Sequence, residues 1–210
     1  MTEQEIKSIL VKTNAVITND HFVYTSGKHG STYINKDAVF AYAREMEKLG
    51  MAIAEKFSNA HIDVILGPVV GGAILAQWTA SALSNKGGQE VLAVYADKGE
   101  KDGDGTDTFM IKRGYDTLIK DKRVLIVEDI LTTGGSVRKV VAVAREEGAD
   151  IIGVCALCNR GGVTPHDIGD VPRLEALISV VFEIFDASDC PLCKEERPVN
   201  TQFGKGKLFV

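Results

Sequence analysis

The chain has 210 residues, the length of one α/β domain, and its 45% hydrophobic residues suffice for a full core. A net charge of -5 and a pI near 5.4 exclude a basic, nucleic-acid-coating surface. No apolar run approaches the roughly 18 residues of a membrane helix, and the N-terminus is unlike a signal peptide, so we expect no membrane partner and a cytoplasmic location.

The elements up to residue 96 alternate between helical and strand-like patterns. Residues 2–13 carry Ile6, Ile9 and Leu10 at helical spacing, whereas residues 21–40 are strand-like with a break at 26–28. Further along we expect a helix over 41–59, a buried strand at 64–66, a helix from about 73 to 83 and a strand at 91–96.

Residues 97–108 interrupt this alternation, because they are rich in Gly, Asp and Lys and contain no apolar residue. With no packing energy to hold it, this segment is predicted to be a mobile loop. After it we expect a strand or turn at 109–115, strands at 124–127, 151–157 and 180–185, a helix at 138–147 and an irregular tail from 186. The alternation predicts a parallel sheet covered by helices, without an internal repeat.

The most informative stretch is VLIVEDILTTGGS at residues 124–136. A buried strand ends at Glu128 and Asp129, and a turn of small residues then opens a helix: Thr132, Thr133, Gly134, Gly135 and Ser136. Small residues let backbone N–H groups approach a phosphate, and the N-terminus of the helix adds a partial positive charge. The two carboxylates suit ribose hydroxyls or a hard divalent cation, so the stretch predicts a sugar-phosphate site.

Two other loops are expected beside this stretch, because ligands of parallel sheets bind at the carboxyl ends of the strands. One follows Leu66 and contains Gly67 and the Gly71-Gly72 pair; the other follows Ala96. Glycine permits close backbone approach, although an ordinary strand-to-helix turn would also explain Gly67 to Gly72.

The four cysteines form two C-x-x-C pairs, and four thiolates could bind zinc. Cys155 and Cys158 lie in a predicted strand, where residues three apart face opposite sides and clamp one metal poorly. We therefore favour free or structural thiols, keep a metal site as the alternative, and expect disulfides least in a reducing cytosol. Cys190 and Cys193, in the polar tail, are the better metal candidates.

The stretch 124–136 resembles the phosphoribosyl pyrophosphate motif of type I phosphoribosyltransferases. Further segments resemble the orotate phosphoribosyltransferases: FVYTSGKHGSTYIN, GPVVGGAILA and residues 112–115 and 159–162. The resemblance covers nearly the whole chain and implies one domain over 1–210, with an α/β core at about 41–159. A central parallel sheet flanked by helices, a small hood (about 1–40 and 160–210) and a mobile loop are its expected parts.

This resemblance also implies the activity. Members of the family transfer ribose 5-phosphate from phosphoribosyl pyrophosphate to orotate, giving orotidine 5'-monophosphate and pyrophosphate in pyrimidine biosynthesis. It implies Mg2+ as cofactor and a homodimer in which the mobile loop reaches the partner's site. Magnesium would be held mostly through the substrate, with Asp129 the candidate direct ligand.

The roles of the phosphate-binding residues follow from the same resemblance. Thr132 to Ser136 would wrap the 5'-phosphate, while Glu128 and Asp129 would hold the ribose hydroxyls and steady a cationic transition state. The expected pyrophosphate loop comprises Val69, Val70, Gly71 and Gly72. The expected diphosphate contacts are Lys98, Lys101, Lys112 and Arg113; the plainer alternative is that these charges only face solvent.

On the base side, Arg160 would bind the planar acceptors of orotate, with an ordinary surface arginine as the alternative. Lys28 would belong to the base-side loop and reach the diphosphate or face solvent. Tyr33 and Asn35 resemble base-flanking positions. The side chain of Trp78 is expected only to pack against the core.

Three cations of well-known members are absent. Gly103 to Gly105 stand where a loop histidine is expected, Val70 and Gly71 replace a Tyr-Lys pair, and Thr25 replaces a lysine. Two other functions therefore stay open: transfer to another nucleobase, and a non-catalytic sensor of phosphoribosyl pyrophosphate. The sensor is disfavoured because the chain lacks a helix-turn-helix module and a basic face.

Overall fold

The structure is a computed structural model that describes residues 1–24, 26–101, 103, 105–180 and 182–208. Its centre is a six-stranded sheet with the order β10-β9-β8-β5-β6-β7. The strands are β5 (Val64–Pro68), β6 (Leu92–Lys101), β7 (Asp107–Met110), β8 (Arg123–Leu131), β9 (Asp150–Asn159) and β10 (Leu174–Ser179). Neighbouring strands pair in parallel except β7, which pairs antiparallel with β6. The predicted α/β fold is confirmed.

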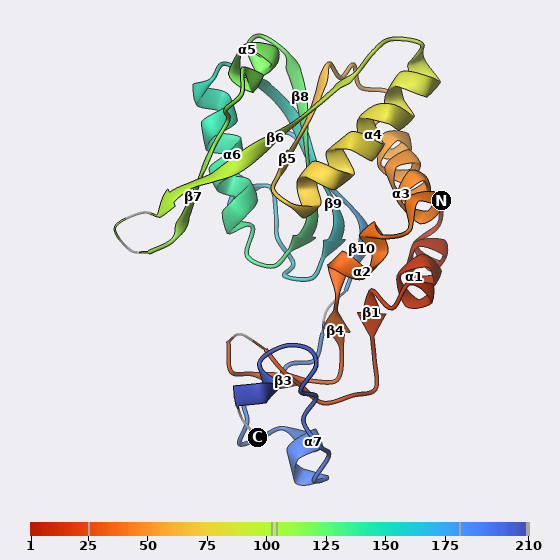
Figure 1. The fold of residues 1–210 in the computed structure, drawn as a ribbon, viewed down its shortest axis with the longest axis vertical. Helices are drawn as coiled ribbons and strands as arrows, with labels where there is room; N and C mark the ends of the chain where they lie inside the picture. Colours follow the sequence, from red (N-terminus) through yellow and green to blue (C-terminus); the bar gives the residue numbers. More distant parts are fainter. Residues whose placement is uncertain (25, 102, 104, 181, 209–210) are drawn as a thin grey trace.

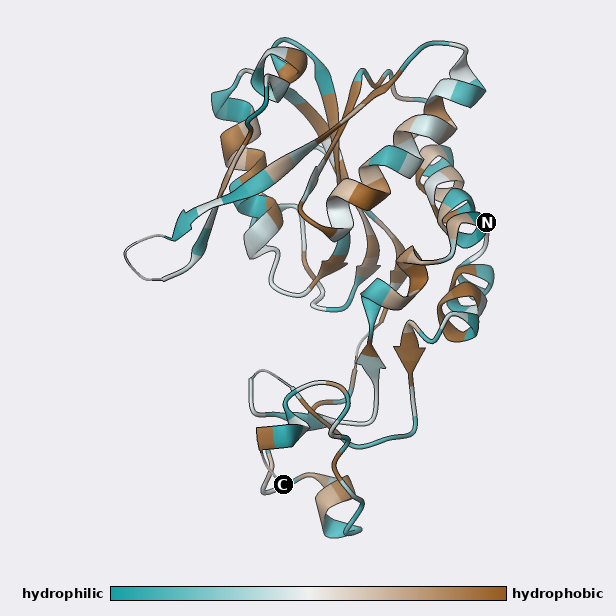
Figure 2. Cartoon of the chain, in the orientation of Figure 1, coloured by the Kyte–Doolittle hydropathy of each residue, from teal (hydrophilic) through white to brown (hydrophobic). Residues whose placement is uncertain are grey.

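Helices cover both faces of this sheet (Figure 1). The long ones are α1 (Glu3–Lys12), α3 (Ala43–Lys56), α4 (Gly71–Gly87) and α6 (Gly135–Glu146). Along β8, Leu125 and Val127 pack in one hydrophobic cluster with α3 and α4, whereas Val124 and Ile126 pack in a second cluster with α6. This alternation follows from the period of two in a strand, and it fixes β8 from both sides. Apolar residues accordingly line the strands in Figure 2.

A smaller part of the molecule, here named the small lobe, comprises residues 18–32 and 182–208 and lies apart from the sheet in Figure 1. It contains the antiparallel pair β2 (Phe22–Val23) and β3 (His29–Gly30), the short helix α7 (Pro191–Lys194) and a 3-10 turn at Gly206–Leu208. It joins the body through β1 (Val16–Ile17), β4 (Tyr33–Ile34) and α2 (Lys36–Phe40). Among the described residues, no buried member of the two hydrophobic clusters comes from this lobe.

The segment 97–108 is more ordered than the sequence predicted. β6 continues to Lys101 and pairs with β7, so the two strands form a hairpin that projects from the body (Figure 1). The Nζ of Lys98 lies 2.6 Å from an Asp107 carboxylate oxygen across the hairpin. Ladder hydrogen bonds and this cross-strand pair replace the missing apolar packing. Asp102 and Asp104, two residues of this predicted loop, lie outside the described residues.

Four shorter elements also differ from expectation. α2 ends the region predicted as strand-like, α5 (Tyr115–Ile119) follows the predicted turn, and α7 lies in the predicted irregular tail. The last strand is β10 at 174–179 rather than 180–185, because Leu177 and Ile178 are the residues that bury against the body. A 3-10 turn at His166–Ile168 precedes it. Both α1 and β10 pack with the body, although the resemblance assigned them to the hood.

Candidate functional site

The acid pair lies buried at the carboxyl end of β8. The Oε1 of Glu128 accepts a hydrogen bond of 2.8 Å from the Asp129 amide, and the Oδ1 of Asp129 accepts one of 2.6 Å from the Ile130 amide. The Oδ2 of Asp129 lies 2.8 Å from the Nζ of Lys36. The strand therefore fixes both carboxylates, and a cation from α2 compensates one of them.

Glu128 and Asp129 have different electrostatic surroundings. Burial, followed by the neighbouring Asp129 charge, raises the pKa of Glu128 well above its ordinary value. Burial opposes the charge of Lys36, but the hydrogen bond and charge of Asp129, aided by Asp37, outweigh it and raise the pKa of Lys36. The Lys36 ammonium therefore compensates Asp129, whereas the raised pKa of Glu128 means that its proton is held more tightly than in an ordinary glutamate.

Lys36 is a site residue that the sequence did not reveal. It follows Asn35 directly, at the point where the strand-like region ends. A lysine beside a predicted base-flanking position is a signal that could have been used. Its partner, however, is distant in sequence, and only the fold brings the two together.

The turn after β8 forms a small cradle. Glu128 and the residues from Ile130 to Val137 line a hollow of about 140 Å³. Gly134 caps α6 with φ +74°, a left-handed conformation, and a Cβ there would come within 2.5 Å of Ile168. The first N–H groups of a helix have no partner inside the helix, so α6 offers this hollow donors suited to an anion.

The loop between β5 and α4 touches the acid pair. A Cβ on Gly71 would lie 1.7 Å from the Oδ2 of Asp129. The amide of Val69 donates to the Ala96 carbonyl at 3.0 Å, while the Val70 side chain is exposed. The predicted pyrophosphate loop is thus in direct contact with Asp129, one of the two predicted ribose acids. The sequence predicted that this loop lies beside the stretch 124–136.

A larger cavity of about 600 Å³ opens between the body and the small lobe. The body and the connection contribute Tyr33, Ile34, Lys36, Asp129, Ile130, Thr132 and Arg160, and the small lobe contributes Tyr24, Ser26, Gly204 and Lys205. Ile130 and Thr132 also line the cradle, so the two hollows share a wall. The site therefore has a narrow end on the body, where α6 begins, and a wider end covered by the small lobe.

Arg160 lies at the junction of these two hollows. Its Nε donates a hydrogen bond of 2.9 Å to the Oγ1 of Thr132. The turn that carries it is braced by Asn159, whose side chain donates to the Val163 carbonyl and accepts from the Val163 amide. A Cβ on Gly161 would lie 1.6 Å from the Thr132 carbonyl oxygen, so only glycine fits this close approach.

The other predicted base-side residues are placed differently. Tyr33 lines the cavity and packs on Phe22 and Phe203, with ring centroids 5.4 and 5.6 Å away. The Nζ of Lys28 pairs with Asp186 at 3.3 Å and is not among the cavity-lining residues. Asn35 caps α2 without a side-chain hydrogen bond to the helix. Thr25, the position where a lysine was expected, lies outside the described residues.

The predicted diphosphate cations gather on the hairpin rather than in the cavity. Lys98, Lys101 and Lys112 line a hollow of about 570 Å³ together with Gly99 and other hairpin residues. Arg113 lies at the base of the hairpin, where its Nε donates to Asp97 at 3.2 Å and its guanidinium lies over the Tyr95 ring. The structure thus groups three lysines but leaves them outside the lining of the cavity.

The two C-x-x-C pairs have different surroundings. Cys155 and Cys158 are free and buried, and burial raises the pKa of each thiol to about 12. Cys190 and Cys193 are also free and lie in the small lobe beside two histidines, His21 and His29.

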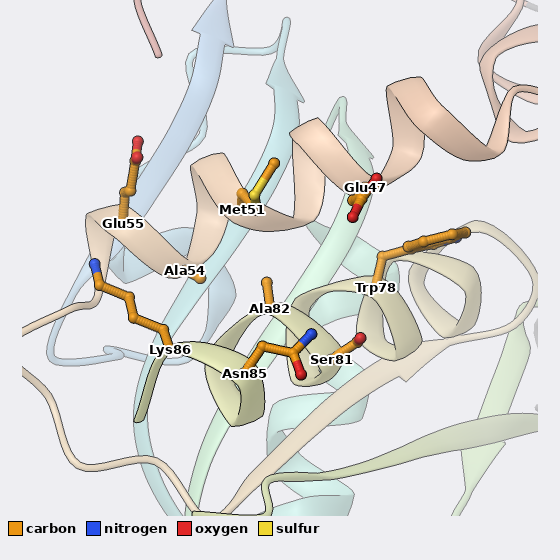
Figure 3. Close-up of a pocket in the computed structure, with 9 residues that line it drawn as sticks. All are labelled: Glu47, Met51, Ala54, Glu55, Trp78, Ser81, Ala82, Asn85 and Lys86. Atoms are coloured by element: carbon orange, nitrogen blue, oxygen red, sulfur yellow. The ribbon is translucent and has the colours of Figure 1, made fainter. Parts of the chain in front are cut away.

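A further hollow of about 350 Å³ lies between α3 and α4 (Figure 3). Trp78 lines it and also packs against the core, which confirms the packing role predicted for this residue. It shares no residue with the cavity or the cradle. Within the described part of the chain, no helix has the length and apolar character to cross a membrane.

Comparisons with known proteins all find phosphoribosyltransferases. A family model for the phosphoribosyl transferase domain matches residues 37–187. The chain is 34% identical to orotate phosphoribosyltransferase of Caldanaerobacter subterraneus subsp. tengcongensis over 199 residues, which cover 95% of this chain and 96% of that one. The crystal structure of orotate phosphoribosyltransferase from Aeropyrum pernix matches with a TM-score of 0.66 at 23% identity, covering 83% and 93%. That of Mycobacterium tuberculosis H37Rv, in complex with 5-phospho-alpha-D-ribosyl 1-diphosphate, matches with 0.64 at 17%, covering 84% and 95%.

Proposed function

Because this chain belongs to the phosphoribosyltransferase family, among the orotate phosphoribosyltransferases, we propose that it transfers ribose 5-phosphate from phosphoribosyl pyrophosphate to orotate. The products are orotidine 5'-monophosphate and pyrophosphate, within pyrimidine biosynthesis. The observation that carries the proposal is the shared wall between the anion-binding cradle and the larger cavity. A sugar phosphate in the cradle would direct its reactive carbon toward a base in that cavity.

The acid pair suits the transition state of this reaction. The bond from ribose C1 to the diphosphate breaks while a bond from an orotate nitrogen to C1 forms, so C1 carries positive charge. Asp129, which is fixed by its contacts with Ile130 and Lys36, would lie along the ribose and stabilise that charge. Glu128, whose pKa is raised by burial and by the neighbouring Asp129, would hold a ribose hydroxyl beside it.

The departing pyrophosphate needs compensating charge. Because Gly71 has no side chain, the β5–α4 loop can lie directly against Asp129, where its backbone would reach a diphosphate, and Lys36 adds a cation to the adjoining cavity. Lys36 therefore offers one replacement for the cations that this chain lacks relative to well-known family members. It would hold the diphosphate side of the substrate while keeping Asp129 oriented.

Magnesium is part of the proposal, as the family implies. The donor set fits a cation carried by the substrate better than one bound by the protein alone, because one oxygen of Asp129 already faces Lys36 and the other accepts from Ile130. The diphosphate oxygens would supply most ligands, with Asp129 as the protein contact. When bound, the cation would neutralise charge on the leaving group.

The hairpin supports the proposal of a homodimer. Lys98, Lys101 and Lys112 share one hollow, yet none of them is a lining residue of the cavity described above. A hairpin that projects from its own body is suited to reach another subunit and close over the diphosphate there (Figure 1). A cytoplasmic location completes the proposal, and four free cysteines suit such a reducing compartment.

Orotate fits the wide end of the site better than an uncharged base does. Its carboxylate needs cationic donors, and Arg160 and Lys205 both line the cavity. Transfer to another nucleobase and phosphoribosyl pyrophosphate sensing remain the rival functions.

One assay separates the three functions. The protein is incubated with phosphoribosyl pyrophosphate, Mg2+ and orotate, uracil, adenine or hypoxanthine in turn, and pyrophosphate release is measured. We expect release with orotate and none with the other bases. Release only with another base would reassign the acceptor, and binding without any release would favour the sensor.

A further inference from the structure

The small lobe holds a Cys/His cluster, which consists of His21, His29, Cys190 and Cys193. One ligand atom from each residue lies within 4.8 Å of all the others. His21 directly precedes β2 and His29 lies in β3, whereas Cys190 is the N-cap of α7 and Cys193 lies within that helix. Four side chains that are typical zinc ligands thus meet from the two ends of the chain.

The three sulfur–nitrogen distances within the Cys/His cluster match a tetrahedral metal site, and the two ring nitrogens, at a hydrogen-bond distance, would move apart by a few tenths of an ångström to admit the ion. Zinc bonds of about 2.0–2.3 Å separate neighbouring ligand atoms by about 3.3–3.8 Å at tetrahedral angles. The Sγ of Cys193 lies 3.3 Å from the Nδ1 of His29 and 3.7 Å from the Nε2 of His21. The Sγ of Cys190 lies 3.8 Å from the same Nε2, and the two ring nitrogens are 2.9 Å apart.

A hydrogen bond outside the cluster sets the tautomer of His21. Its Nδ1 lies 2.8 Å from the carbonyl oxygen of Arg197, which can only accept. The ring proton of neutral His21 therefore resides on Nδ1, and the Nε2 lone pair points toward the two sulfurs and His29. Backbone carbonyls orient metal-binding histidines in this same way.

The small lobe also needs such a link, because it has little apolar packing. Phe22, Val23, Cys190 and Leu192 are its buried apolar residues, and they belong to neither hydrophobic cluster of the body. Its strands are two residues long. Small units of this kind are commonly held together by a metal or by disulfides, and all four cysteines here are free.

We propose that the Cys/His cluster binds one structural Zn2+ ion, which joins the N-terminal hairpin of the small lobe to the C-terminal tail. Cys190 and Cys193 bind as thiolates, and His21 and His29 bind as neutral imidazoles through Nε2 and Nδ1. Their two negative charges balance the charge of the ion. The four protein ligands leave no open position, so this ion is structural and separate from the magnesium of the transfer reaction.

The test uses the full chain without a histidine tag. Metal content is measured by inductively coupled plasma mass spectrometry for the wild type, Cys190→Ala, Cys193→Ala and two controls. Cys155→Ala removes a buried cysteine outside the cluster, and His166→Ala removes an exposed histidine. We expect about one zinc ion per chain in the wild type and both controls, and a loss of most of it in the two cluster variants.

A second measurement does not depend on how the variants fold. The wild type is stripped with a zinc-selective chelator and titrated with Co2+, whose visible spectrum reports tetrahedral geometry and thiolate ligands. We expect both signatures at one equivalent, and their displacement by Zn2+. Absence of zinc together with absence of a thiolate–cobalt band would overturn the proposal. So would a Cys190–Cys193 disulfide found by mass spectrometry, or full zinc retention in the double variant Cys190→Ala/Cys193→Ala.

Discussion

The body and the small lobe line one cavity together, but different interactions stabilise them. In the body, Glu128 and Asp129 stand on a strand that is buried on both faces by apolar side chains. In the small lobe, backbone hydrogen bonds hold Tyr24 and Lys205 beside short strands, and the Cys/His cluster lies in the same lobe. We infer that the half of the site proposed for the sugar phosphate is fixed by hydrophobic packing, whereas the half proposed for the base would depend on the proposed zinc ion.

The largest expected effect comes from the body. Asp129→Asn removes the charge that faces the ribose, so turnover should fall by about 10²-fold or more. Circular dichroism and thermal unfolding should show an intact fold. Asp150→Asn, which alters an exposed carboxylate paired with Arg123, is the matched control and should keep full turnover. Unchanged turnover in Asp129→Asn would remove this residue from the site.

The contact between the β5–α4 loop and the acid pair can be tested with two glycines of one helix. Gly71→Ala places a methyl group on the Asp129 carboxylate and should cost about 1–3 kcal/mol of stability and at least roughly tenfold in turnover. Gly87→Ala, where a Cβ meets nothing within 4 Å, should gain up to about 1 kcal/mol. Denaturant unfolding and initial rates measure both. Equal effects of the two changes would show that the loop is not tightly packed.

The hairpin tests whether cations outside the cavity take part. If Lys101 closes over the diphosphate as proposed, Lys101→Ala should lower turnover by about tenfold, because the variant loses that cation. The melting temperature should hardly change, since the side chain has little to pack against. A matched loss in thermal stability would instead mark the residue as structural.

The small lobe has its own test in Lys205. This residue lines the cavity from the C-terminal tail. Lys205→Ala should raise the KM for orotate several-fold while leaving the KM for phosphoribosyl pyrophosphate unchanged, because it removes a base-side contact only. Equal changes in both constants would contradict the division of the site between body and small lobe.

The smallest effect concerns pH. Glu128 is protonated in folded and unfolded protein well below its ordinary pKa of 4.5. Between that value and its raised folded pKa, only the unfolded chain is ionised, so stability falls as pH rises through this range. Glu128→Gln removes this pH-dependent loss of stability, because glutamine does not ionise. Its stability relative to wild type should therefore increase from acid to neutral pH in denaturant titrations, and a constant difference would contradict the raised pKa.

The sequence predicted the body well because its strands and helices carry strong apolar periodicity. It missed α2, α5 and the extended β6, since these are short or held by polar contacts rather than by apolar faces. Lys36 and the histidines of the Cys/His cluster were missed because their partners are distant in the chain. The roles of the individual site residues, and the assignment of 1–210 to a single domain, stay predictions.

The central claim, that the two halves of the site are held by different forces, is tested most directly by hydrogen–deuterium exchange with and without zinc. We predict that removing zinc speeds exchange in peptides spanning residues 20–30 and 186–205 and leaves β5 and β8 unchanged. Exchange that is unaltered in the small lobe, or that rises equally in both parts, would contradict the claim.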